Sequence, residues 1–412
     1  MSTAHKARTT LLVGLSASIV AALVATSCGD DTSGTGGAGS GGDSASTSSS
    51  TSVASQGATT TVVSSSSGAA GGGQGGDAPT SPTLPADPSE PWERLDQWNL
   101  FADPVAQVPN ERVVPYQVIA PLFSDETAKL RFVYVPEGST IHYEDDGPWG
   151  FPEGAVLVKT FAYPLDARDE GGPLILMETR LLWRVDDDWR TMTYVWNEEQ
   201  TEAVRKSAGG FVPVQWIDAD GEDRTLEYVV PNNNQCRECH QSDDQLLTLG
   251  GRTLQMDLEG DAGNQIDMLA ELGFFDVAPT AADERVHLVD PFGEDDVGPR
   301  ARSYLHGNCA SCHTDGGSAS QSGLLLDFAD SDPEVDPINV GICKIPTSAG
   351  GATCGLTFDI VPGDPDASIM MCRVETTETE IRMPPLARQL VHEDGVGLLR
   401  DFIESLPPAG CE

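Results

Sequence analysis

The chain has 412 residues, of which 64 are acidic and 24 are basic, giving a formal net charge of −40 at pH 7. This charge repels phosphate backbones and anionic lipid headgroups, which argues against nucleic acid and acidic membrane surfaces as partners. It favours a protein partner with a basic face, although solubility in a salty setting explains the same charge. The length is enough for two or three domains.

The amino terminus has the pattern of an export signal. A basic start precedes the apolar run Leu11–Val24, which is too short to span a membrane comfortably. Small residues then lead to Cys28, as in the lipobox of bacterial lipoproteins, so residues 1–28 are predicted to be a lipoprotein-type signal peptide with Cys28 lipidated. Ordinary cleavage and an uncleaved anchor are the alternatives. Each predicts export, and lipidation predicts a membrane-anchored lipoprotein in the periplasm or on the cell surface.

Residues 29–90 consist mainly of Gly, Ser, Thr and Ala with a few Pro. Such a segment cannot bury enough apolar surface to offset the entropy lost on ordering. We therefore expect a disordered linker that tethers the folded part to the membrane.

Residues 91–235 are predicted to form an antiparallel β sandwich or barrel. Runs rich in β-branched and aromatic residues alternate with turn-forming residues, and this region holds all seven Trp. Its only histidine, His142, is expected at the surface. The predicted strands are Val113–Leu122, Leu130–Val135, Ala155–Tyr163, Leu174–Val185, Thr191–Trp196 and Leu226–Val230.

Two copies of Cys-x-x-Cys-His follow. The first comprises Cys236, Cys239 and His240, and the second comprises Cys309, Cys312 and His313. This pattern is typical of covalent c-type haem attachment. On one helical turn the two thiols lie side by side, where they reach both vinyl groups of one porphyrin, and the histidine offers a nitrogen to the iron. The sequence therefore predicts two covalently attached haem c groups.

Other uses of paired cysteines fit less well. Zinc ribbons place their Cys-x-x-Cys pairs about 15–20 residues apart, far closer than the two pairs here, and do not require His after both pairs. A thioredoxin-like redox motif needs a βαβ context that neither pair has. One haem with a degenerate second motif, a bound metal and a disulfide remain as alternatives.

Residues 236–294 form the predicted first haem-binding segment, which we expect to be mostly helical as far as Phe275. The sixth ligand of its iron is open. Met256 is the leading candidate, followed by Met268, with His287 and His306 more distant. An open or weakly ligated iron is a further alternative, and peroxide could bind there.

Residues 295–412 follow the plan of a small class I cytochrome c. A helix, Pro299–Asn308, leads into the second motif, and a final helix, Val396–Leu406, has one apolar face. Between them lies Met383, followed by two prolines that hold the loop extended. In cytochrome c domains of this kind this methionine is the distal ligand, so Met383 is predicted to ligate the second iron. Met370 or Met371 is the alternative.

Nine cysteines occur in the chain. Removing the lipidation site and the four haem thiols leaves Cys343, Cys354, Cys372 and Cys411. An even remainder in an exported protein indicates two disulfide bonds, and three pairings are possible. We favour Cys343–Cys354 across a Gly-rich loop together with Cys372–Cys411. Free or buried thiols are the alternative.

Further stretches of the chain form a recognisable set: APLFSD at 120–125, FPEGAVLVKTF, METRLLWR, YVWNEEQTEA, YVVPNNNQCRECH, ARSYLHGNCASCH, FDIVPGDPDASI and RMPPL. Together they resemble an exported diheme c-type cytochrome family, often described only as conserved hypothetical. The resemblance covers about residues 95–407. In some relatives a similar module is joined to a quinoprotein sugar-dehydrogenase-like domain, which implies a role in passing electrons out of periplasmic oxidations.

Together these features predict an α+β protein, with an antiparallel β domain followed by mainly α-helical cytochrome c-like haem regions. The predicted function is electron transfer outside the cytoplasm, without catalysis on a substrate. Two alternatives remain. One is a haem peroxidase or the cytochrome subunit of a periplasmic dehydrogenase. The other is a surface ligand-binding lipoprotein with structural haem.

Overall fold

The computed structural model describes residues 80–242, 245–260, 263–347 and 353–412. The predicted signal peptide, Cys28 and most of the predicted linker lie outside these residues. The described part belongs to one compact unit. It combines an antiparallel sheet with short helices, so the α+β class is confirmed.

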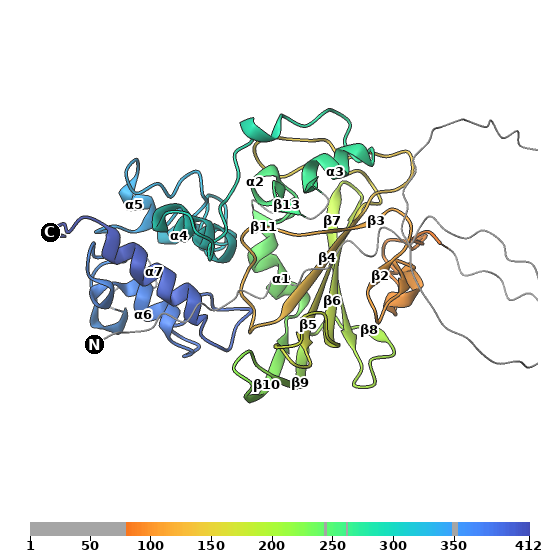
Figure 1. The fold of residues 1–412 in the computed structure, drawn as a ribbon, viewed down its shortest axis with the longest axis horizontal. Coiled ribbons are helices and arrows are strands. Elements are labelled where there is room, and N and C mark those ends of the chain that lie inside the picture. The colour runs from red at the N-terminus through yellow and green to blue at the C-terminus, as the bar shows by residue number, and fades with distance from the viewer. Residues whose placement is uncertain (1–79, 243–244, 261–262, 348–352) are drawn as a thin grey trace, which may run out of the picture. The chain divides into compact units, whose positions relative to one another are not determined.

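The central element is a six-stranded antiparallel sheet in the order β3-β4-β5-β6-β7-β8 (Figure 1). Five of the predicted strands correspond to strands of this sheet, and the sixth corresponds to β10. The sheet strands are β3 (Val113–Tyr116), β4 (Ala128–Tyr134), β5 (Val156–Pro164), β6 (Leu174–Val185), β7 (Asp188–Trp196) and β8 (Ala203–Arg205).

Within the described residues, β3 and β8 are the two edges and do not pair with each other. The prediction of a sandwich or barrel was therefore wrong in detail, because the sheet is open and a separate hairpin covers part of one face. The remaining strands form four two-stranded ladders. They are β1 (Phe101–Asp103) with β2 (Val108–Pro109), β9 (Gly210–Ile217) with β10 (Asp223–Val230), β11 (Gln241–Ser242) with β12 (Gln245–Leu246), and β13 (Glu259–Gly260) with β14 (Gly263–Asn264).

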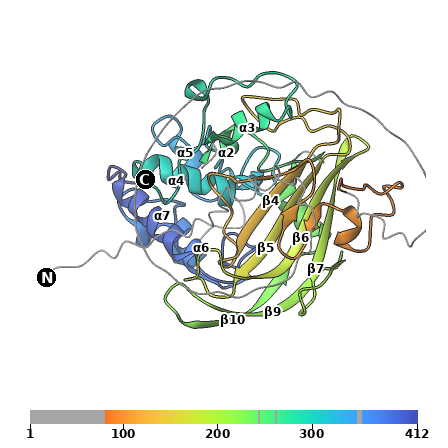
Figure 2. The ribbon, with the colours of Figure 1, turned by 45° about the vertical axis from the view of Figure 1, so that its right-hand side comes forward.

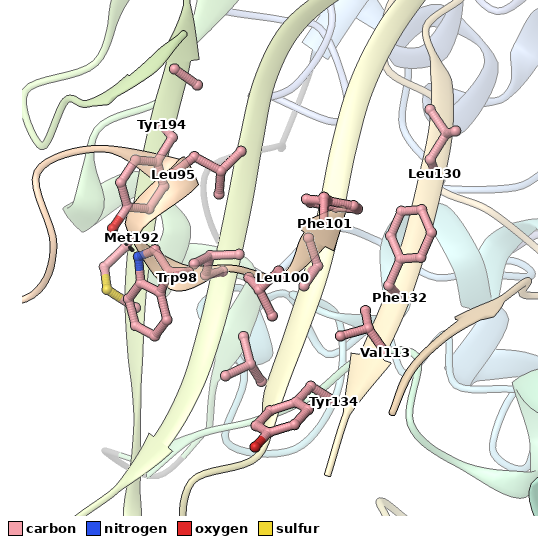
Figure 3. Close-up of a cluster of buried hydrophobic side chains, with 14 of the residues drawn as sticks. Leu95, Trp98, Leu100, Phe101, Val113, Leu130, Phe132, Tyr134, Met192 and Tyr194 are labelled. Carbon is pink, nitrogen blue, oxygen red and sulfur yellow. Dashed lines mark hydrogen bonds between the residues drawn. The ribbon is translucent and has the colours of Figure 1, made fainter. Parts of the chain in front are cut away.

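One face of the sheet is covered by the segment that precedes β1. Trp98 is fully buried there, and its Nε1 donates a 2.6 Å hydrogen bond to the hydroxyl of Tyr194 (Figure 3). Leu84 packs against the same cluster, and the amide of Thr83 donates to the Trp98 carbonyl. The folded part therefore includes residues 80–90, and the predicted linker is shorter at this end than expected.

The opposite face is covered in two places. At one end, Met256, Ile266 and Leu269 pack against Leu157 and Trp189 of the sheet. At the other end, the β9-β10 hairpin packs its aromatic residues against β5 and β6. The stretch after the first motif is thus a cover of short helices and hairpins, and the prediction that it is mostly helical was wrong. The helices are α1 (Asn233–His240), α2 (Thr253–Met256) and α3 (Gln265–Glu271).

The carboxyl-terminal part has its own apolar core, in which α4 packs against α7. In both views α4 and α7 group with α6, and the strands β4 to β7 lie side by side in the sheet (Figure 1 and Figure 2). The two predicted helices correspond to α4 and α7, with one π-helical turn, His306–Ala310, continuing α4. The helices here are α4 (Val297–Leu305), α5 (Pro337–Val340), α6 (Ile369–Glu375) and α7 (Glu393–Ser405). Single 3₁₀ turns occur at Leu95–Trp98, Ala282–Glu284, Ser320–Ser322, Thr353–Gly355 and Pro365–Ala367.

The loop between β3 and β4 joins the sheet to the carboxyl-terminal part. Asp125 Oδ1 accepts hydrogen bonds from the amides of Gln389 and Leu390, at 2.6 and 2.8 Å. The amide of Phe123 donates to Asn308 Oδ1, and the Phe123 ring stacks on His392 at 4.1 Å between ring centroids. This loop contains the APLFSD stretch, whose role the sequence alone does not explain.

The described residues contain two disulfide bonds, but these join different partners from those we favoured. Cys343 pairs with Cys411, and Cys354 pairs with Cys372. The turn that carries Cys354 packs against α6, which carries Cys372, while the tail after α7 returns to Cys343. The pairing follows this packing, whereas Cys343–Cys354 was favoured because a short Gly-rich loop joins those two residues. Among the described helices, none has the length and apolar character to span a membrane.

Candidate haem-binding sites

The first motif lies on α1, and its helix start is well defined. The Asn232 side chain accepts hydrogen bonds from the amides of Asn234 and Gln235, and the Gln235 side chain accepts one from the Asn232 amide. This reciprocal capping box fixes the start of the helix. Cys236 is buried, and His240 closes the helix four residues later. The Asn-rich run before the motif therefore orients the attachment residues.

A backbone carbonyl group orients the imidazole of His240. Its Nδ1 lies 3.0 Å from the carbonyl oxygen of Leu247, and the Leu247 amide donates to the His240 carbonyl. A carbonyl can only accept, so Nδ1 carries the proton and Nε2 keeps a free lone pair. Burial lowers the pKa of His240 to about 4, which keeps the ring neutral at neutral pH. This is the form that can ligate iron through Nε2.

The second motif follows α4 and the π-helical turn. The His313 amide donates to the Cys309 carbonyl, and the Leu326 amide donates to the His313 carbonyl. His313 Nδ1 lies 2.9 Å from Ser322 Oγ, which orients the ring as Leu247 orients His240. Burial lowers the pKa of His313 to about 4, so this ring is also neutral at neutral pH.

A cavity of about 190 Å³ lies beside the second motif. Cys309, His313 and Met383 all line it, so the structure brings the predicted distal ligand to the same cavity as the predicted proximal one. The Met383 amide donates to the Arg373 carbonyl, which fixes the loop at this point. Met370 also lines the cavity and stays open as an alternative. Met371 is buried in the apolar core and is absent from the cavity wall.

The donor set around this cavity fits a haem. A thiol, a neutral imidazole and a thioether share one mostly apolar space, and the walls include Leu305, Leu324 and Ile369. A porphyrin needs an apolar slot of this kind with iron ligands on its two sides. Within the described part of the chain, no group of three or more His, Cys, Asp or Glu side chains could hold a metal ion by itself.

The two motifs are in direct contact. Cys312 Sγ donates to the carbonyl oxygen of Glu238 at 3.3 Å, and Ser318 Oγ donates to the same oxygen at 2.9 Å. Glu238 is one of the two residues between the cysteines of the first motif. The interaction between the Cys239 and Cys312 thiols raises the pKa of Cys239 and lowers that of Cys312. The fold thus brings together two motifs that are far apart in sequence.

The candidates for a distal ligand at the first motif have other partners. Met256 is 2% exposed in the core beneath the sheet, where Gln265 Nε2 lies 3.5 Å from its sulfur. Met268 packs against the same cluster. His287 Nδ1 lies 3.2 Å from Asp257 Oδ2, and the Phe328 amide donates to His306 Nδ1. In the described residues no hydrogen bond or ion pair joins any of these four side chains to His240, and the position of Met256 favours packing over ligation.

Sequence reasoning missed several residues around the motifs. Leu247 acts through its backbone carbonyl, which leaves no signal in the side chain. Ser322 is one of many serines in a polar loop. Lys159 was visible as a cation in the middle of the apolar run AVLVKTFAY, in a strand that is buried on both faces. A charge at such a position indicates an interior role, because it is costly to bury without a partner.

Comparison with known proteins gives no match: no protein-family model, curated protein or solved structure is similar to this chain. The functional argument therefore rests on the motifs and their geometry.

Proposed function

We propose that this protein is a diheme c-type cytochrome that carries electrons outside the cytoplasm, as a member of the exported family that it resembles. The observation that carries the proposal is the contact between the two motifs, through Glu238, Cys312 and Ser318. Two haems attached at adjoining motifs would lie beside each other, which is the arrangement that electron exchange between them requires. Each bound haem would supply one-electron chemistry at its iron.

The side chains around the motifs have distinct roles in this proposal. Cys236, Cys239, Cys309 and Cys312 would form the thioether bonds, and His240 and His313 would be the proximal ligands. Met383 would be the distal ligand of the second iron and would raise its reduction potential relative to bis-histidine ligation. Leu247 and Ser322 hold the two imidazoles in the orientation that leaves Nε2 free for iron.

The carboxyl-terminal part supports a class I cytochrome c-like arrangement. α4 enters the second motif, α7 packs across α4, and Met383 faces the cavity from the loop between α6 and α7. We further propose that the chain is exported and anchored through a lipid on Cys28. Its acidic surface would then favour redox partners with a basic face.

The test is a haem count on the full chain, produced with export and haem attachment intact. A pyridine haemochrome assay should give two haems per chain, and metal analysis should give iron in the same ratio. The oxidised spectrum should contain the far-red band of a methionine–iron bond. Zinc bound to the four thiols, or protein without covalent haem, would overturn the proposal. Turnover of peroxide would instead favour the alternative function of a haem peroxidase.

A further inference from the structure

A row of positive charges crosses the middle of the sheet. The register places Arg131 of β4 opposite Lys159 of β5, and Lys159 opposite Arg180 of β6. Like charges directly opposite one another on a sheet are destabilising. The chain has only 24 basic residues against 64 acidic ones, yet three of the basic ones are immediate cross-strand neighbours here. Such a row needs a negative partner.

These cations lie on the interior face of the sheet. Lys159 Nζ is 4.7 Å and the Arg180 guanidinium carbon 4.3 Å from the centre of the Phe161 ring. Phe161 belongs to the apolar cluster beneath the β9-β10 hairpin, on the face opposite Trp98. The chain runs from Tyr228 and Val230 of this cluster into α1, and then to Leu246, which belongs to the cluster at the other end of the same face. The first motif therefore lies on the same face of the sheet as the row.

The protein itself neutralises the row only in part. Glu178 is fully buried, makes a two-pronged ion pair with Arg180, and accepts a 2.6 Å hydrogen bond from the Tyr228 hydroxyl. Lys129, two residues before Arg131, donates to the Thr127 carbonyl. In the described part of the chain, no hydrogen-bond acceptor lies against Lys159 Nζ. Among the described residues, Glu178 is the carboxylate that forms an ion pair with the row, and burial lowers the pKa of Lys159 well below its ordinary value.

The side chains of the row are largely buried but keep some solvent-accessible surface. A quarter of the Arg180 side chain stays accessible, and Arg131 and Lys159 are half-buried. Because these side chains keep some accessible surface, they can contact a group that binds on this face of the sheet. Paired carboxylates are the groups that Arg and Lys bind best in such surroundings.

We propose that the row formed by Arg131, Lys159 and Arg180 receives the propionate carboxylates of the haem attached at Cys236 and Cys239. This inference rests on the proposed function. It assigns a role to the sheet, which would supply the positive charge that pairs with the propionates of the first haem. Two propionates offset most of the excess positive charge. The cations in turn disfavour the ferric state, which carries one more positive charge than the ferrous state, and so raise the potential of this haem.

The experiment compares Lys159→Met with Lys206→Met in the full-length, haem-loaded protein. Lys206 is exposed, so its variant makes the same charge change away from the row. Lys159→Met should keep two haems while the potential of the first falls. A threefold change in its ferric-to-ferrous ratio at fixed potential corresponds to about 30 mV. That potential should also become more pH-dependent, because a propionate without its cation takes up a proton more readily.

The second haem, the Lys206→Met control and a charge-retaining Lys159→Arg variant should show no such shift. If Lys159→Met does not fold, Arg131→Gln repeats the test within the same row. Two bound haems with an unchanged potential and pH profile would overturn the inference while leaving the proposed function intact. A shift of the wild-type potential on adding inorganic phosphate or acetate would also overturn it, since the row would then bind free anions. Absence of haem from the wild type would instead overturn the proposed function.

Discussion

The two motifs differ in how far along the chain their surrounding residues lie. Around the second motif, Ser322, Leu326 and Met383 all lie within the carboxyl-terminal part, and a compact helical core holds them. Around the first motif, α1 supplies the attachment residues, but the facing surface comes from strands more than fifty residues earlier. A site built from nearby residues leaves a readable pattern in the sequence. A site assembled from a helix and a distant sheet leaves little beyond its attachment motif.

The largest expected effect separates the two sites by removing one pair of thiols at a time. Cys309→Ala with Cys312→Ala should leave one haem per chain, and so should Cys236→Ala with Cys239→Ala, because each pair holds its own porphyrin. The pyridine haemochrome assay measures both. If either double variant lost both haems, the two sites would depend on each other for attachment and the comparison would break down.

A smaller effect is expected at the distal side of the second site. Met383→Ala should abolish the far-red band and lower the potential of one haem, because the thioether ligand that favours ferrous iron is lost. Met370→Ala is the matched control, since Met370 lines the same cavity. Loss of the band in the Met370 variant alone would reassign the ligand. Optical redox titration reports both quantities.

Met256 tests the other side of the comparison. Met256→Ala should cost about 2–5 kcal/mol of stability, as expected for truncating a buried methionine in a packed core. The spectrum of the first haem should stay as in the wild type. Urea denaturation monitored by Trp fluorescence measures the loss, with the half-buried Met268→Ala as a milder control. A change of spin state in the Met256 variant would restore this residue as a ligand.

The smallest effect lies away from both sites and gives a reference for pH titrations. His142 is exposed as expected, and its hydrogen bond and ion pair with Asp276 raise its pKa above 6.5. A raised histidine pKa stabilises the fold fully below the unfolded pKa of about 6.5. That contribution is lost as the pH rises through the folded value. NMR titration of the His142 ring should give a pKa above 6.5 in the wild type. In the Asp276→Asn variant this pKa should fall toward 6.5. An unchanged value in this variant would exclude the ion pair as the cause.

Local pattern was enough to predict β3 to β7, β10 and the two long carboxyl-terminal helices. The β6-β7 pair was readable because its turn residues Asp186 and Asp187 adopt left-handed conformations that suit a two-residue hairpin. β9 was missed because its residues are mostly exposed or half-buried and include Pro213. Strand and helix signals are local, and so these elements could be read from the chain.

Features that depend on tertiary packing could not be predicted in the same way. The Cys354–Cys372 bond follows from the docking of a turn on α6, and the pairing of Cys343 follows from the path of the tail. Met256 looked like a ligand because it follows the first motif closely in sequence. Its packing beneath the sheet depends on where α2 and α3 dock, which no short-range pattern specifies.

The contact of Asp125 with the amides of Gln389 and Leu390 has a consequence for how the chain acquires its structure. It joins residues that are separated by more than half the length of the chain, so forming it closes a long loop at a cost in chain entropy. The segment that follows Met383 is therefore secured only once the β3-β4 loop is in place. A fragment that begins at residue 295 would lack this anchor, and the carboxyl-terminal part is better regarded as the last layer of one assembly than as a detachable module.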